Sequence, residues 1–336
     1  MGQSPDGSTY SEKPKDYILV QGNSDIKDGW VEPRLWTTQM TKKADVGDLI
    51  MSVRAPAGSM GKTAYNVVIG RGVAAIKGNE FIFQSLIKKD IEGFWKKITT
   101  GSTFESLNSN DIKNSNLLVP VNEEQIKIGQ YFSQLDNLIT LHQRECDQLK
   151  ELKKSMLKKM FPRDESSIPE VRFAGFTDAW EQRKLRDEAI EILAGGDIDK
   201  EKTVENGKYP IYANALTNDG IVGYYDDYYR VTAPAVTVTG RGEVGYAKAR
   251  MTHFTPVVRL LAVCSNHDCY FLENAINNHK VVVESTGVPQ LTVPQLSSYN
   301  IFFPANDKEE VRIGKYFHTL DNLITLHQRL YVLVKK

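Results

Sequence analysis

LDNLITLHQR occurs at residues 135–144 and again, letter for letter, at residues 320–329. Four further identities precede it in both copies: Ile128/Ile313, Gly129/Gly314, Tyr131/Tyr316 and Phe132/Phe317. The copies are 185 residues apart (320 minus 135), far beyond the roughly 20 to 50 residues of solenoid repeats. The repeat therefore indicates a duplicated domain.

Upstream of each copy the two halves share the spacing of a few residues but little sequence identity. Pro120 and Pro304 precede the repeated segments, and the pairs Gly58/Gly61 and Gly242/Gly245 have the same spacing. Two interpretations stay open. One is a recent duplication with uneven drift, and the other is a pair of helices that meet the same partner twice while the two bodies read different targets.

Each repeated segment carries the apolar seam of a long helix. The apolar positions alternate in steps of four and three, which is the heptad pattern of paired helices. The seam positions expected to pair helices or bind a partner are Ile128, Phe132, Leu135, Ile139, Ile313, Phe317, Leu320 and Ile324. A helix from about Glu123 to Phe161 would be roughly 58 Å long, which suits a spacer. The basic run 142–163 fits a solvated helix face as well as one that faces phosphate.

The bodies, residues 1–120 and 184–303, mix short β-rich runs with Gly and Asn turns. Strands are predicted at 17–22, 49–53, 73–76, 235–240, 257–264 and 280–285. One helix per body is predicted, near Glu80–Ile98 and near Phe271–Asn278. The fold class is therefore α/β (α+β), with irregular β-rich sheets.

Composition limits the class of protein. The 336 residues contain 42 Lys plus Arg and 42 Asp plus Glu, which excludes a histone-like polycation. No apolar run approaches the roughly 18 residues needed to span a membrane, and the start has no signal-peptide character. Three cysteines make no disulfide framework, so we expect a reducing cytoplasm.

Motifs for chemistry in this chain are weak. GRGEVG at 240–245 matches GxGxxG, but β-favouring residues follow it where a dinucleotide site needs a helix, so a strand-connecting turn is the favoured interpretation. Cys264, His267 and Cys269 lie close in sequence but lack a second ligand pair, so buried thiols with a loop histidine are favoured over a metal site. No GxSxG, HExxH or P-loop pattern occurs. We expect no catalytic residue, no metal site and no cofactor in this chain.

The combined pattern resembles the specificity (S) subunit of Type I restriction-modification systems. The resemblance is carried by the paired LDNLITLHQR helices, LKELKKSMLKKMFP, VRFAGFTDAWEQRKL at 171–185, the MGQSP start, and the GSTFESLNSNDI and TGVPQLTVPQL stretches. It covers nearly the whole chain.

The resemblance implies two target recognition domains in a pseudo-two-fold arrangement, separated by long helices that pack as an antiparallel coiled coil. The expected boundaries are 1–122 for the first domain, 123–162 for the central spacer helix, 163–307 for the second domain and 308–336 for the C-terminal helix. It also implies a bacterial cytoplasmic complex with double-stranded DNA, two modification subunits and restriction subunits. S-adenosylmethionine, ATP and Mg²⁺ would be bound by those partners, which would perform adenine methylation and cleavage at a bipartite site.

Candidate DNA contacts come from side-chain chemistry. Arg and Lys pair with guanine, and Asn and Gln with adenine, in the major groove. The candidates are Gln21, Asn23, Arg54 and Lys62 in the first body, and Asn214, Arg241, Lys248 and Arg250 in the second, each of which also fits an ordinary surface residue. Ser102 and Thr103 could donate to phosphate or cap a turn.

Two other functions stay open. A coiled-coil scaffold with protein-binding bodies fits the same helices. A truncated, inactive specificity subunit fits the ends: MGQSP resembles 192–197, so residues 163–193 have no first-copy counterpart, and the last helix is short. The sequence is thus expected to start and stop inside a repeat.

Overall fold

The computed structural model describes residues 1–99, 106–163, 166–215, 217–279 and 289–335. The chain divides into two compact units, residues 1–138 and 139–336, and the division falls inside helix α4 (Asn122–Met160). The predicted spacer helix, 123–162, is therefore observed, beginning one residue earlier and ending two residues earlier than expected. Pro162 follows its C-terminus, where a proline ring opposes further helix.

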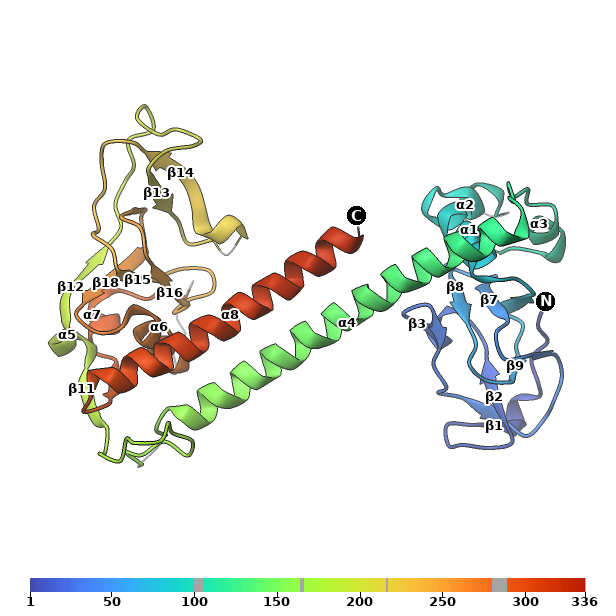
Figure 1. The fold of residues 1–336 in the computed structure, drawn as a ribbon, viewed down its shortest axis with the longest axis horizontal. Coiled ribbons are helices and arrows are strands. Elements are labelled where there is room, and N and C mark those ends of the chain that lie inside the picture. The colour runs from blue at the N-terminus through green and yellow to red at the C-terminus, as the bar shows by residue number, and fades with distance from the viewer. Residues whose placement is uncertain (100–105, 164–165, 216, 280–288, 336) are drawn as a thin grey trace. The chain divides into compact units, whose positions relative to one another are not determined.

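Unit 1 is built on two small sheets (Figure 1). The first has the strand order β1-β5-β2-β9-β6: β1 Tyr10–Ser11, β5 Trp36–Thr37, β2 Tyr17–Val20, β9 Val67–Ile69 and β6 Lys43–Ala44. The second has the order β10-β7-β8-β4-β3: β10 Val73–Ile76, β7 Leu49–Ser52, β8 Met60–Lys62, β4 Trp30–Val31 and β3 Ile26–Lys27. The helical segments are η1 Gly7–Thr9, η2 Asn23–Asp25, α1 Glu80–Ile91, α2 Phe94–Ile98 and α3 Ser109–Lys113, besides the first part of α4.

Unit 2 has a four-stranded, a three-stranded and a two-stranded sheet. The strands are β12 Ala189–Ala194, β18 Leu260–Ser265, β15 Ala235–Thr239 and β16 Ala247–Arg250 in that order; β14 Ile221–Tyr225, β13 Tyr209–Tyr212 and β17 Thr255–Pro256; and β11 Glu181–Lys184 with β19 Asn300–Phe303. The helical segments are α5 Leu185–Glu188, η3 Thr217–Gly220, α6 Cys269–Asn278, α7 Val293–Ser297 and α8 Asp307–Lys335, besides the rest of α4.

Both units pack the long helix on the first turn of a body helix through the same glycine of the repeat. A Cβ on Gly129 would lie 3.0 Å from the backbone nitrogen of Phe81 in α1. A Cβ on Gly314 would lie 2.9 Å from the backbone nitrogen of Phe271 in α6 and 2.0 Å from Oδ1 of Asp268, which caps α6. The missing side chain therefore permits the close approach in both copies.

The backbone supports the predicted alignment of MGQSP with residues 192–197. The Gly2 amide donates to the Val73 carbonyl on β10 at 2.9 Å, and the Gly195 amide donates to the Leu260 carbonyl on β18 at 2.7 Å. In both bodies this segment thus binds the strand that precedes the body helix, β10 before α1 and β18 before α6.

The second part of α4 and α8 pack antiparallel within unit 2 (Figure 1). His142 lies against His327, and Lys153 further along α4 reaches Asp321, which is earlier on α8. Near the end of α4 the aromatic ring of Phe161 stacks on Phe271 and contacts Phe317. The predicted fold class, two β-rich units with antiparallel long helices, is confirmed.

One detail differs from the predictions. The helix expected over Glu80–Ile98 is broken into α1 and α2, because Gly93 takes φ +71° between them. The glycine-rich segment 240–245 connects β15 to β16, so the turn interpretation is confirmed. The strand predicted at 280–285 lies outside the described residues.

Within the described ranges, no helix combines the length and apolar character that crossing a bilayer requires.

Candidate nucleic-acid interface

An open, polar concavity of about 270 Å³ lies in unit 1 and contains three of the predicted DNA-binding residues. Gln21, Asn23 and Arg54 all line it, although 33 residues separate Gln21 from Arg54. Its other lining residues are Ser4, Gly22, Ser52, Ala55, Arg71 and Gly72. Sequence reasoning missed Arg71, although its two flanking glycines repeat the Gly-Arg-Gly pattern at 240–242.

The glycines around Arg71 bring its turn against Gln21. A Cβ on Gly72 would lie 2.0 Å from the Gln21 carbonyl oxygen, and one on Gly70 would lie 2.8 Å from Oε1 of Gln21. A larger residue at position 72 would push the turn away, and one at position 70 would displace the Gln21 amide. The turn therefore holds the exposed Arg71 beside the polar end of Gln21.

Hydrogen bonds fix the amide of Gln21. Its Nε2 donates to the Tyr10 hydroxyl at 2.6 Å, and its Oε1 accepts from Ser4 at 3.3 Å. The backbone amide of Gln21 donates to the buried carboxylate of Asp25 at 2.6 Å, and Arg34 binds the same carboxylate. Arg34 does not line the concavity, and the arginines that do are the exposed Arg54 and Arg71.

Lys62, Ser102 and Thr103 do not join this group. Nζ of Lys62 donates to Glu80 at 2.8 Å and lies 4.7 Å from the ring centroids of both Trp30 and Phe83. Its side chain is only 15% exposed. The ion pair with Glu80 and the contacts with the two rings therefore compensate its positive charge inside the fold. Ser102 and Thr103 lie outside the described residues.

In unit 2, three of the four predicted residues are bound to neighbours. The Asn214 amide donates to the Val258 carbonyl and accepts from the Gly240 amide. Lys248 and Arg250 both bind the carboxylate of Asp219. The remaining candidate, Arg241, is exposed on the turn between β15 and β16.

Arg250 is the most enclosed of these candidates. It is 7% exposed, its Nε donates to Thr237 at 3.0 Å, and its guanidinium lies 3.7 Å from the Tyr212 ring centroid. Burial raises the pKa of Tyr212, so the ring stays neutral beneath the cation. The geometry supports a positioning role for Arg250, in which it holds Asp219 beside Lys248.

A second concavity, of about 420 Å³, lies in unit 2, and no residue in its lining was predicted. It is lined by Lys208, Tyr209, Ala233, Pro234, Met251, Thr252 and His253. The His253 ring stacks on Tyr229 with centroids 4.5 Å apart, and Tyr229 lies 4.9 Å from Tyr209. A hydrogen bond with Tyr209 raises the pKa of Lys208. These aromatic and basic groups were spread over too many residues of sequence to form a motif.

The predicted helix-pairing residues differ between the two copies. Unit 2 buries the second set, and Ile313, Phe317 and Leu320 belong to its main core together with Met160 and Phe161. In the first copy Phe132 is 42% exposed, and Ile128, Leu135 and Ile139 are half-buried. Exposed Tyr131 and Leu138 extend this apolar surface of α4.

The segment 264–269 does not gather its thiols and imidazole. Nδ1 of His267 lies 3.0 Å from Glu310 and its Nε2 lies 2.9 Å from Glu188, so carboxylates flank both ring nitrogens. The Cys269 thiol donates to the Ala235 carbonyl, and burial raises its pKa to about 12. A buried neutral thiol fits a packing role.

Comparison with known proteins identifies the family. The sequence profile of the "Type I restriction modification DNA specificity domain" matches residues 12–151 and 177–336. A sequence assigned as the type I restriction enzyme MjaX specificity subunit of Methanocaldococcus jannaschii is 30% identical over 165 residues, which are 47% of this chain and 38% of the relative. The MjaVIII specificity subunit of the same organism is 29% identical over 130 residues, 38% of this chain and 30% of the relative. These alignments thus span less than half of either relative.

A solved structure shares the fold. The crystal structure of a Type I restriction-modification S subunit from M. genitalium aligns over 99% of this chain and 89% of its own, with a TM-score of 0.71 and 13% identity. At this identity the similarity concerns the fold alone. Because the domain profile matches most of the chain, in two copies, the chain belongs to the family of Type I restriction-modification DNA specificity (S) subunits.

Proposed function

We propose that this chain is the non-catalytic, sequence-specific DNA-binding subunit that directs adenine methylation and restriction by partner subunits to a bipartite DNA site. The observation that carries the proposal is the concavity of unit 1, where Gln21, Asn23, Arg54 and Arg71 gather in one copy of the DNA specificity domain. Arginine recognises guanine through O6 and N7, and glutamine or asparagine recognises adenine through N6 and N7. The concavity thus offers the side chains that direct base reading requires.

The second half of the site is assigned to unit 2. Arg241 is exposed on the turn after β15, and Lys248 is held beside Asp219 at the start of β16. Glycines 240 and 242 flank Arg241 and allow backbone to approach a ligand closely. Under the proposal, residues 1–122 and 163–307 each read one part of the target.

The partner surface is assigned to the exposed apolar face of α4. Tyr131, Phe132 and Leu138 are each more than 40% exposed, while the second copy buries the equivalent of Phe132. An apolar helix face of this kind suits another helix in its groove. We assign it to a modification subunit, which would bind S-adenosylmethionine, while restriction subunits would bind ATP and Mg²⁺.

The test is a methylome measured in cells that express this chain with its modification subunit. We expect a methylated bipartite adenine motif that disappears when the chain is omitted. R71A should relax one part of the motif and R241A the other, whereas R186A, at another exposed arginine, which is paired with Asp187, should leave both parts unchanged. Absence of any motif that depends on this chain overturns the proposal.

A coiled-coil scaffold is the second candidate, and the exposed face of α4 is the observation that favours it. The two functions differ in their response to salt. Specific DNA binding weakens steeply as salt rises, because phosphate contacts release condensed counterions. A scaffold would bind its protein partner through the apolar face and show no such dependence on DNA or salt.

A further inference from the structure

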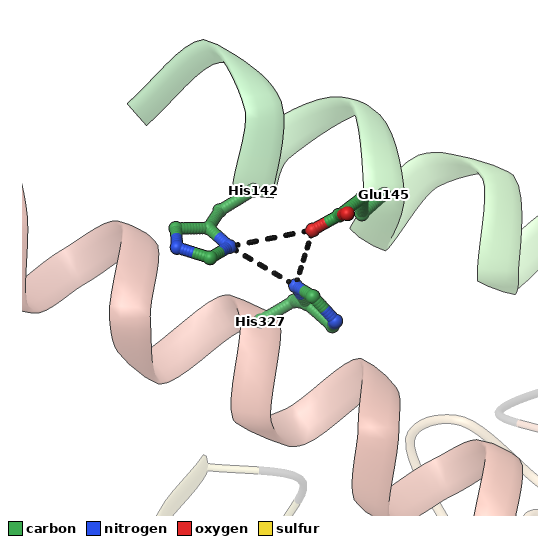
Figure 2. Close-up of side chains that lie close together, drawn as sticks. All are labelled: His142, Glu145 and His327. Atoms are coloured by element: carbon green, nitrogen blue, oxygen red, sulfur yellow. Dashed lines mark hydrogen bonds and ion pairs between the residues drawn. The ribbon is translucent and has the colours of Figure 1, made fainter. Parts of the chain in front are cut away.

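Two histidines at equivalent positions of the repeat contact each other in unit 2. His142 of α4 and His327 of α8 occupy the same position of LDNLITLHQR, and their Nδ1 atoms lie 3.1 Å apart (Figure 2). Glu145, one turn along α4, completes a triangle: its Oε2 lies 3.4 Å from Nδ1 of His142 and 3.0 Å from Nδ1 of His327. The second copy has Leu330 at the position that corresponds to Glu145, so only one helix supplies the carboxylate.

A cation fits this triangle better than protons do. If one Nδ1 carries a proton, it donates to either the carboxylate or the other ring, and the remaining lone pair faces the carboxylate oxygen. If both carry protons, both can donate to the carboxylate oxygen, but the two donor nitrogens are then held only 3.1 Å apart. A cation at the centre would satisfy all three lone pairs at once.

The dimensions suit a transition-metal ion. Zinc binds imidazole nitrogen and carboxylate oxygen at about 2.0–2.2 Å, so neighbouring ligand atoms of a tetrahedral site lie about 3.3 Å apart. The observed sides of 3.0, 3.1 and 3.4 Å fit that edge. The opposite ring nitrogen of each histidine points away from the triangle (Figure 2). Two imidazoles favour zinc, cobalt, nickel or copper over magnesium, which prefers oxygen ligands.

The site is enclosed enough to select such an ion and open enough to admit it. The side chains of His142 and His327 are 19% and 18% exposed, and that of Glu145 is 39% exposed. Solvent can therefore supply a fourth ligand. Among the described residues, this is the one group of three or more His, Cys, Asp or Glu side chains whose ligand atoms converge in this way.

We propose that His142, His327 and Glu145 form a structural site for a divalent transition-metal ion that clamps α4 to α8. The ion would be held through Nδ1 of each imidazole and one oxygen of the carboxylate. It binds the folded pair of helices and not the separated helices, so it would stabilise their packing by mass action. The ion-pair contact between Lys153 and Asp321 holds the same two helices without metal, so metal removal would loosen unit 2 rather than unfold it.

The test uses the untagged full-length chain, stripped of metal and titrated with Co²⁺, whose visible absorption bands report a tetrahedral site of nitrogen and oxygen ligands. We expect saturation at one equivalent, displacement of Co²⁺ by Zn²⁺, no displacement by Mg²⁺, and a rise in melting temperature on metal addition. H142Q and H327Q should abolish the bands and the thermal shift. Loss of a group that only supports a metal ligand typically lowers metal affinity by roughly 10- to 100-fold. E145Q removes a ligand itself, so it should weaken Co²⁺ binding by at least that factor.

The matched control is H318Q, which removes a histidine of α8 that contacts Asn322 instead of the cluster. It should bind Co²⁺ as the native chain does. Circular dichroism shows whether each variant keeps its fold. Folded native chain that binds Co²⁺ no more tightly than folded H142Q or H327Q, or bands that vanish in H318Q, overturns the proposal.

Discussion

Gly129 and Gly314 occupy the same position of the repeat, yet the space around them differs. At Gly129 an added Cβ would meet its nearest atoms at 3.0 Å, but at Gly314 it would overlap the cap carboxylate of Asp268 at 2.0 Å. Alanine gains about 1 kcal/mol of helix propensity over glycine at either position. We expect G129A to be nearly neutral and G314A to lose about 1–3 kcal/mol, the usual cost of overpacking. Urea unfolding of both variants checks this, and equal effects would contradict the difference in packing.

His267 links the stability of unit 2 to pH. Its burial alone would lower its pKa, but hydrogen bonds and charges of Glu310, and then of Glu188, outweigh burial and raise the pKa. Below about pH 6.5, the ordinary pKa of histidine, the folded and unfolded chains are both protonated and the ion pairs stabilise fully. That stabilisation is lost as pH rises through the raised pKa of the folded state.

We therefore expect the free energy of unfolding of the native chain, relative to H267Q, to be greatest at acidic pH and to decline above about pH 6.5. Urea titrations at a series of pH values measure this difference. E188Q should show a smaller decline that is complete at a lower pH, because one of the two carboxylates that raise the folded-state pKa is neutral. A difference that grows with pH would have the wrong sign for this ion-pair network.

Arg71 is the residue of the concavity with the clearest expected effect on DNA. Loss of a bidentate contact to guanine costs about 1–3 kcal/mol of discrimination. R71A should therefore bind the cognate site about 10- to 100-fold less tightly, with less loss on non-cognate DNA. Gel-shift titrations of the complex with its modification subunit measure both affinities. An equal loss on both DNAs would instead indicate a phosphate contact.

Side-chain chemistry alone predicted three of the residues that line the concavity of unit 1, and missed others for a physical reason. Gln21 directly follows strand β2 and Asn23 begins the next short helix, so both lie in one local turn of the sequence. Lys62 and Arg250 were chosen by residue type, but their partners Glu80 and Asp219 are 18 and 31 residues away. Ion pairs over such separations depend on tertiary packing and leave no local pattern.

At the scale of elements, one sequence seam has two environments. In α8 it joins the core of unit 2, whereas in the first part of α4 it stays half-buried or exposed. We expect L320D to lose about 3–5 kcal/mol, because it places an unpaired charge in the core. L135D should cost about 1 kcal/mol or less but abolish capture of the modification subunit.

Thermal unfolding and co-purification separate the two effects. L135D that unfolds the chain would show that this position also belongs to a core. If L135D stays folded and still binds the modification subunit, the docking face proposed on α4 is wrong. L320A, which removes bulk without adding charge, is the control for loss of packing at that position.

The elements that sequence predicted well are those with strong local signals. The run 73–76 is strand β10 at its predicted limits, and α4 keeps its heptad pattern to Met160. The break at Gly93 was missed because a single glycine inside an apolar periodic run is also tolerated in a helix. Two-residue strands such as β1 and β5 carry no periodicity, and only pairing defines them.

At the scale of the whole molecule, a formal net charge of zero limits how strongly the chain alone attracts DNA. Phosphate contacts of the complex would then come largely from its partners. We expect the slope of log affinity against log salt to steepen by about 0.9 for every phosphate contact that a modification subunit adds. Filter-binding titrations of the chain with and without that subunit measure the slopes. Equal slopes would place the phosphate contacts on this chain.

The four tryptophans are divided unequally: Trp30, Trp36 and Trp95 belong to unit 1, and Trp180 belongs to unit 2. Trp180 is buried with Phe161 and Phe271 around its indole, each 5.8 Å away between ring centroids. The aromatic packing at the end of α4 thus contains a natural optical probe. Subtracting the fluorescence of W180F from that of the native chain isolates the emission of unit 2, so the unfolding of each half can be followed separately in one intact chain without any added label.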